Sequence, residues 1–154
     1  MNITIKIEIS EKIKKLSQLV QIGLQRGVTK STAYVTQQVV SNAPRITGNL
    51  KRSIHSEVTS LGSSLSGKII QDSGIASYGR YVEEGTGLYG PYHKVIRPKN
   101  GKVLSWKING VKIYASYIKG MTGRLYMRRA FDESKDTVKE IIAEEILKEI
   151  NVGG

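Results

Sequence analysis

The stretch GTGLYG, residues 85–90, matches the spacing G-x-G-x-x-G that binds dinucleotides in many enzymes. That pattern holds a pyrophosphate only where it follows a strand, opens a helix and is followed about 20 residues later by an acidic side chain. Here Pro91 follows at once, no amphipathic helix opens, and position 110 is a glycine. The sequence therefore predicts no dinucleotide site and no other cofactor.

Carboxylates and histidines are the other groups that could do chemistry. Glu83 and Glu84 are adjacent, and neighbours along a helix do not face each other, so they make a poor general acid and base pair. We expect them instead to cap a helix or to form an ion pair. His55 and His93 fit no metal-ligand spacing, and the chain contains no cysteine. The sequence predicts no metal site.

A metal-dependent nuclease or hydrolase would need a cluster of carboxylates. Asp72, Glu83 and Glu84 are the only acids in residues 61–127, and their spacing fits no such motif. A nucleophile elbow of the form G-x-S-x-G is also missing from the sequence. We therefore expect no catalytic residue, no enzymatic activity and no small-molecule substrate.

The charge of the chain is high and uneven. Its 24 Lys and Arg residues outnumber its 13 Asp and Glu residues, which gives a net charge of +11. Residues 61–127 carry ten basic and three acidic groups, whereas residues 128–154 carry five basic and seven acidic groups. A basic body followed by a mildly acidic C-terminal segment indicates contact with a polyanion or with an acidic partner surface. A basic surface that only keeps the protein soluble is the alternative.

The stretch VLSWKINGVKIY, residues 103–114, predicts a β-hairpin with a two-residue turn at Asn109-Gly110. Such a turn places Lys107 directly opposite Lys112, although like charges across a strand pair cost stability. One face of the hairpin is then apolar and is expected to pack on the domain or on a neighbouring subunit; it contains Trp106, Ile108, Val111 and Ile113. The candidate residues that face a partner or DNA are Arg97, Lys99, Lys102, Lys107 and Lys112. Two lysines that splay apart in water are the alternative, at a cost of a few tenths of a kcal/mol.

The remaining pattern predicts an α+β fold in one domain, residues 1–154, with residues 86–123 as a basic excursion. Two long helices pack on a small antiparallel sheet, from which the hairpin protrudes. The first helix is expected to be continuous, with a bend near Gly27, and two helices in line are the alternative. The expected elements are a strand at 3–9, a helix at 11–42, strands at 51–59 and 65–72, a short helix or turn around 76–83 and a helix at 127–150. No apolar run approaches the roughly 20 residues of a membrane span, and the alternating N-terminus is not a signal peptide.

Three stretches in order carry a family resemblance: APRITGNLKRSI (43–54), YGRYVEEGT (78–86) and RLYMRRAFDES (124–134). They resemble the head–tail joining proteins of long-tailed bacteriophages, which are also called neck, tail-completion or minor tail-component proteins. We expect Thr47-Gly48 and Gly85-Thr86 to form turns and Tyr81-Val82 to pack in the core. The sequence departs from the family pattern at Glu84, where an aromatic or apolar residue is usual, and at residues 125–127. The matching positions are Pro44, Thr47, Gly48, Leu50, Tyr81, Val82, Glu83, Gly85, Thr86 and Phe131.

The resemblance implies a virion protein without enzymatic activity, made in the host cytoplasm and placed at the head–tail interface. It implies a ring, with six copies by the symmetry of the tail, between the head connector and the tail terminator or tail tube. DNA would pass through this ring. The alternative is an independent basic nucleic-acid-binding module, which the loop RPKNGK at 97–102 and the nearby Trp106 would favour.

Overall fold

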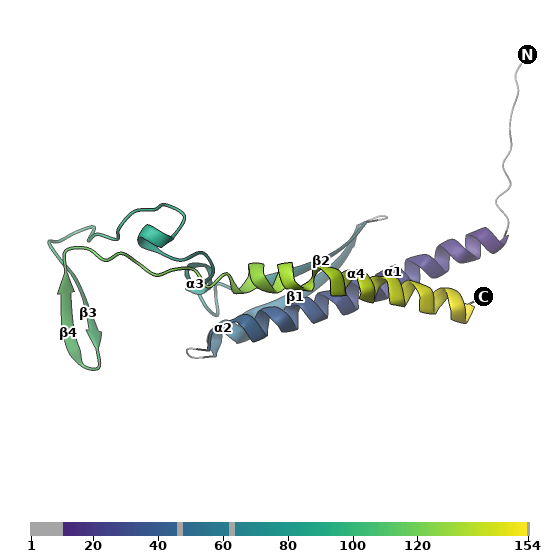
Figure 1. Ribbon diagram of the computed structural model, residues 1–154, viewed down its shortest axis with the longest axis horizontal. Coiled ribbons are helices and arrows are strands. Elements are labelled where there is room, and N and C mark those ends of the chain that lie inside the picture. Colours follow the sequence, from purple (N-terminus) through teal and green to yellow (C-terminus); the bar gives the residue numbers. More distant parts are fainter. Residues whose placement is uncertain (1–10, 46–47, 62–63, 154) are drawn as a thin grey trace, which may run out of the picture. The chain divides into compact units, whose positions relative to one another are not determined.

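The computed structural model describes residues 11–45, 48–61 and 64–153, and it has the α+β fold that the sequence predicts (Figure 1). The strand predicted at residues 3–9 lies outside the described residues. Among the described helices, none combines the length and the apolar character that a membrane span needs. The elements are α1 (Glu11–Asn42), α2 (Asn49–Arg52), β1 (Ile54–Leu61), β2 (Ser64–Gln71), α3 (Gly79–Glu84), the 3₁₀ helix η1 (Gly87–Tyr89), β3 (Leu104–Ile108), β4 (Val111–Ala115) and α4 (Tyr126–Gly153).

The two long helices are the best predicted elements. Helix α1 runs without a break from Glu11 to Asn42, so the prediction of one continuous helix is confirmed. It ends shortly before Pro44, because the residue before a proline avoids the helical region. Helix α4 extends beyond its predicted limits at both ends.

The chain divides into two compact units. Unit 1 contains residues 1–38, 55–70 and 131–154, and unit 2 contains residues 39–54 and 71–130. The strands likewise form two separate two-stranded sheets: β1–β2 is the small antiparallel sheet that the sequence predicted, and β3–β4 is the predicted hairpin. The assignment of the whole chain to one domain stays a prediction.

In unit 1, α1 and α4 lie against each other in antiparallel directions. A Cβ atom added to Gly23 would lie 2.5 Å from the Cα atom of Ile146, and one added to Gly27 would lie 2.8 Å from the Cα atom of Ile142. The helix backbones therefore touch where α1 presents glycines four residues apart. Strand β2 also crosses α1 closely, because a Cβ atom on Gly67 would collide with the hydroxyl group of Thr32.

Ion pairs hold the same two helices together. The carboxylate of Glu145 accepts hydrogen bonds from the ammonium groups of Lys30 at 2.7 Å and Lys148 at 3.0 Å. These hydrogen bonds, first that of Lys30, hold the pKa of Glu145 below its ordinary value. This contribution to stability is therefore present above the ordinary carboxyl pKa and is lost as the pH falls through the lowered value. Arg26 and Glu149 form a second ion pair between the helices.

The backbone contact at Gly27 leads to a first prediction. Replacing Gly27 with alanine would favour an isolated helix by about 1 kcal/mol. In this protein we expect a net loss of about 1–3 kcal/mol in the free energy of unfolding, because the added methyl group overpacks the contact with Ile142. Denaturant unfolding measures the change. Ser17→Ala, at an exposed position of the same helix, is the control and should stay within about 0.5 kcal/mol of wild type. A stabilised Gly27→Ala variant would contradict the contact.

Unit 2 contains most of the buried apolar side chains. They come from the end of α1, from all three stretches of the family pattern and from the chain between the first two: Val39, Ala43, Leu50, Ile54, Ala76, Val82, Tyr126 and Ala130. A polar contact joins two of the segments, since the amide of Asp72 donates to the carbonyl of Ser53 at 2.8 Å. The side-chain amide of Gln71 adds hydrogen bonds to Ser53 and to the carbonyl of Ala76.

One predicted boundary in unit 2 is wrong. Residues 49–52 form the helical turn α2, not the start of a strand, because Gly48 adopts a positive φ of 83° and reverses the chain. The amide of Ser53 then donates to the carbonyl of Asn49, and β1 begins only at Ile54. The prediction of a short helix or turn around residues 76–83 is confirmed, since a turn at 77–78 leads into α3 at Gly79.

The hairpin prediction is confirmed. Strands β3 and β4 pair antiparallel with Trp106 opposite Ile113, Lys107 opposite Lys112 and Ile108 opposite Val111. Asn109 and Gly110 have positive φ angles of 49° and 84°, as a two-residue turn of this handedness requires.

Candidate functional site

Residues 86–123, which we call the arm, leave the core of unit 2 as two chain segments and end in the β3–β4 hairpin (Figure 1). The segments are joined at their base by backbone hydrogen bonds. The amide of Thr86 donates to the carbonyl of Met121 at 2.8 Å, and the amide of Leu88 donates to the carbonyl of Lys119 at 2.7 Å. Further out, Ile96 and Ile118 exchange two backbone hydrogen bonds.

Glycines make this base possible. A Cβ atom on Gly85 would lie 2.7 Å from the amide nitrogen of Gly123 and 2.8 Å from the carbonyl oxygen of Met121. One on Gly87 would collide with the carbonyl of Lys119, and one on Gly120 with that of Thr86. The pattern GTGLYG thus has a structural reason, the close approach of two backbones. The predicted turn at Gly85-Thr86 is part of this base, and the Thr86 hydroxyl accepts a hydrogen bond from the amide of Met121.

The adjacent acids at 83 and 84 have the roles that the sequence predicted, one each. The carboxylate of Glu83 accepts hydrogen bonds from the amides of Met127 at 2.9 Å and Arg128 at 3.1 Å, in the first turn of α4. It thereby satisfies donors that a helix leaves unpaired and places a negative charge at the positive end of the helix dipole. Glu84 instead forms an exposed ion pair with Arg80 at 2.8 Å.

The two acids differ enough to test against each other. We expect Glu83→Ala to lower the free energy of unfolding by about 1–2 kcal/mol, because α4 loses its cap. Glu84→Ala removes the same charge from the adjacent residue, and the exposed ion pair of Glu84 with Arg80 is worth at most about 1 kcal/mol. Thermal unfolding of both variants measures the difference. Equal losses in the two variants would contradict the capping role.

Tyr126 begins α4 and is fully buried, with 0% of its surface exposed. Among the described residues its hydroxyl group has no hydrogen-bond partner. Burial, and after it the negative charge of Glu83, raises the pKa of Tyr126 to about 12.

The variant Tyr126→Phe, compared with wild type, tests the buried phenol. In the unfolded chain a tyrosine ionises near pH 10, whereas Tyr126 stays protonated to about pH 12. Ionisation therefore leaves stability unchanged below pH 10, and we expect roughly 2–3 kcal/mol to be lost as the pH rises from 10 to 12, because the unfolded chain loses this proton first. Tyr126→Phe lacks this loss and should match or exceed wild-type stability at pH 7, because it removes an unpaired polar group. Unfolding curves for both chains at several pH values check this; parallel alkaline losses would contradict it.

The apolar face of the hairpin is open in the single chain. Ile108 is 51% exposed and Val111 is 66% exposed, whereas Trp106 and Ile113 are half-buried. An isolated two-stranded hairpin is marginally stable in water. The face that the sequence expected to be packed is therefore left free for another surface.

The five candidate basic residues all lie on the arm and are exposed. The structure brings only Lys107 and Lys112 directly opposite each other, while Lys99 and Lys102 lie in the loop before β3. Arg97 lies over the ring of Tyr117 at 5.6 Å, and Lys112 over that of Tyr114 at 5.3 Å. Within the described part of the chain none of the five forms an ion pair with a carboxylate. Their role toward a partner stays a prediction.

The motif positions divide between core and surface. Leu50 and Val82 are buried, as expected for the core, and Pro44 is half-buried. The prediction that Tyr81 packs in the core is wrong, because its ring is 58% exposed, and Phe131 is exposed as well. Helical period explains both, since the next residue along, Val82, and the preceding residue, Ala130, take the buried positions. Thr47 lies outside the described residues.

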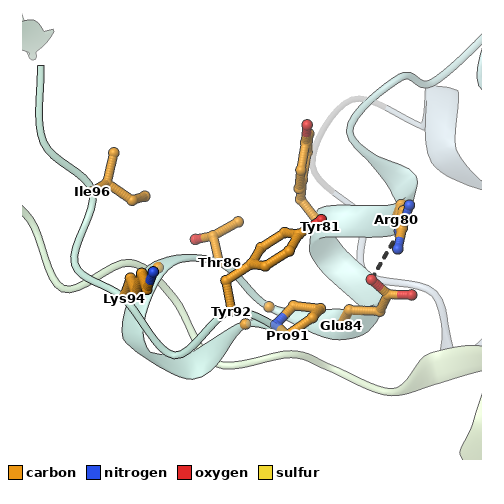
Figure 2. Close-up of a pocket in the computed structure, with 11 residues that line it drawn as sticks. Arg80, Tyr81, Glu84, Thr86, Pro91, Tyr92, Lys94 and Ile96 are labelled. Atoms are coloured by element: carbon orange, nitrogen blue, oxygen red, sulfur yellow. Dashed lines mark hydrogen bonds and ion pairs between the residues drawn. The ribbon is translucent and has the colours of Figure 1, made fainter. Parts of the chain in front are cut away.

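Sequence reasoning missed a surface pocket beside the base of the arm (Figure 2). It has a volume of about 530 Å³ and is lined mainly by apolar surface. Figure 2 shows the rings of Tyr81, Tyr92 and Pro91 on its walls and the ion pair of Arg80 and Glu84 at its edge. His93 follows Tyr92 with an exposed side chain, and His55 is exposed on β1; the described residues contain no group of three potential metal ligands.

The chain is thus a small protein whose core is built from three sequence motifs and whose exposed arm is both apolar and basic. Residues 7–85 match the family model HK97-gp10_like, described as "Bacteriophage HK97-gp10, putative tail-component". The chain belongs to this family, and it is a tail-related structural protein of bacteriophage type, which acts together with other phage structural proteins. The match covers the first two motif stretches almost completely and ends where the arm begins. Searches of curated proteins and of solved structures returned no match.

Proposed function

We propose that this protein is a ring-forming neck or tail-completion component that joins the head connector to the tail terminator or tail tube. The family supports a structural place in the virion, and the arm carries the finer proposal. Ring subunits need a surface that is left uncovered in the single chain, and Ile108 and Val111 form such a surface. Six copies would match the symmetry of the tail, and DNA would pass through the lumen.

The arm is suited to contact a neighbouring protein, because its attachment to the core does not depend on the side chains that it presents. It leaves the core between Glu83 and Arg124, where the amide of Arg124 donates to the carbonyl of Val82 at 2.7 Å. Because its base is held by backbone hydrogen bonds, the arm can present side chains to a neighbour on both hairpin faces. The family match and this architecture support a structural role without catalysis.

An independent nucleic-acid-binding module is the second candidate, and the exposed basic side chains of the arm favour it. Binding through phosphates would fall steeply as salt rises. Tight, salt-sensitive binding of duplex DNA by the isolated chain in a gel-shift series would favour this candidate. Absence of such binding would leave the structural role as the better account.

Complementation tests the structural role. In the phage or prophage that encodes the chain, an amber mutation should give unjoined heads and tails in electron micrographs, and wild-type protein supplied from a plasmid should restore joined particles. We expect Lys107→Glu/Lys112→Glu to restore at most about a tenth as many, because the pair of reversed charges now repels an acidic neighbour or DNA. The folded monomer should be unaffected, which circular dichroism and thermal unfolding check.

Lys12→Glu/Lys15→Glu is the matched control, since it makes the same change in net charge at exposed positions of α1. It should complement as wild type does. Joined and infectious particles that lack the protein altogether would overturn the proposed function. Full complementation by the arm variant would overturn the role of the lysine pair.

A further inference from the structure

A row of acids lies on the exposed side of α4. Four of them are spaced by four residues, which places them on one face of a helix. They are Asp132, Asp136, Glu140 and Glu144, and all four are exposed. We call them the acid row. Glu145, which pairs with α1, is buried, so the acid row is not the face that packs within unit 1.

Neighbouring lysines neutralise only part of the charge of the acid row in the single chain. Like charges four residues apart in a helix destabilise it by a few tenths of a kcal/mol each. Lys135 and Lys139 pair with Asp132 at 2.6 Å and with Asp136 at 2.8 Å, but these pairs are exposed and are worth little. Residues 131–153 contain seven acidic and three basic groups in total.

The arm has the opposite composition. Its 38 residues, 86–123, include seven Lys or Arg residues and no Asp or Glu. The lysine face of the hairpin, with Lys107 and Lys112, also presents Tyr114, whose ring is exposed. On α4, Leu147 is exposed three residues after Glu144 and so lies beside the acid row. Each surface therefore combines one sign of charge with an apolar contact point.

We infer that the lysine face of the arm in one copy binds the acid row of α4 in a second copy. Complementary potentials steer two surfaces together and fix how they dock. Because the two surfaces are different and belong to the same chain, the contact is head-to-tail, which closes into a ring when the rotation between subunits permits it. The inference rests on the proposed ring and names the contact that would build it.

The absence of cysteine from the sequence provides a direct test. Ser105→Cys places a thiol on the lysine face, and Ala143→Cys places one on the exposed side of α4 next to Glu144. One of the two full-length single-cysteine chains carries an affinity tag, so that mixed and like dimers differ in size. When the two chains are mixed and oxidised, we expect the mixed dimer on a non-reducing gel. A salt concentration of about 1 M should abolish the disulfide product, because the Debye length is then about 3 Å and the attraction between the two charged surfaces is screened.

Charge reversal makes the test specific. Lys107→Glu/Lys112→Glu in the Ser105→Cys chain should lower the yield about tenfold or more, since two close charge pairs become repulsive. Glu140→Lys/Glu144→Lys in the Ala143→Cys chain should restore it. Thr29→Cys, exposed on α1, replaces Ala143→Cys as the matched control and should give only background yield. Circular dichroism confirms that each variant is folded.

Several results would overturn the inference. They are a yield no higher than that of the Thr29→Cys control, a yield insensitive to charge reversal, and a failure of the second reversal to restore it. Duplex DNA binding by the arm without any arm-to-α4 disulfide would favour nucleic acid as its partner. Particles that require the protein but show no such disulfide would overturn this inference and leave the proposed function standing.

Discussion

The carboxylate of Glu83 is the interaction on which the architecture of unit 2 depends. It comes from the second motif stretch and accepts hydrogen bonds from the amides that open α4, in the third stretch. A helix begins with unpaired N–H groups, and burying that end without acceptors would be costly. A side chain from 44 residues earlier in the chain meets this need, so the start of α4 and the end of α3 are fixed together. The arm is the chain that connects these two fixed points.

Close backbone approach is the second constraint, and it operates in both units. In unit 1 it lets α1 and α4 touch at Gly23 and Gly27, which leaves little space for side chains between them. In unit 2 it lets the two segments at the base of the arm lie side by side at Gly85 and Gly123. In each case the missing side chain allows a contact that any methyl group would disrupt. At Gly85, which belongs to the second motif stretch, the family resemblance reflects a packing need.

The parts of the fold that the sequence predicted are those set by local rules. The three- and four-residue spacing of α1 and the Asn109-Gly110 turn each determine their element within a few residues. The roles of Glu83 and Glu84 were predicted in kind, but not which helix Glu83 caps, because that partner is distant in sequence. The helical turn α2 was missed because Gly48 reverses the chain just before a segment with strand-like composition. The exposure of Tyr81 could not be read from a motif that fixes only the order of residues.

The spacing of glycines in α1 was a signal that could have been used. Gly23 and Gly27 stand four residues apart, which predicts a close helix contact, whereas we treated Gly27 only as a bend. The pocket beside Tyr81 and Tyr92 has no such signal, because it depends on how residues 80–96 fold back at the base of the arm.

The backbone-closed base of the arm has a consequence for how such a protein changes over time. Hydrogen bonds between main-chain groups at Thr86 and Met121 do not depend on which side chains lie beyond them. Insertions, deletions and charge changes in the arm beyond its base can thus accumulate without disturbing the buried residues of unit 2. Loop-closure entropy rises only slowly with length, so a longer arm costs little. A particle could therefore acquire a new neighbour by exchanging the arm while the core that displays it stays the same.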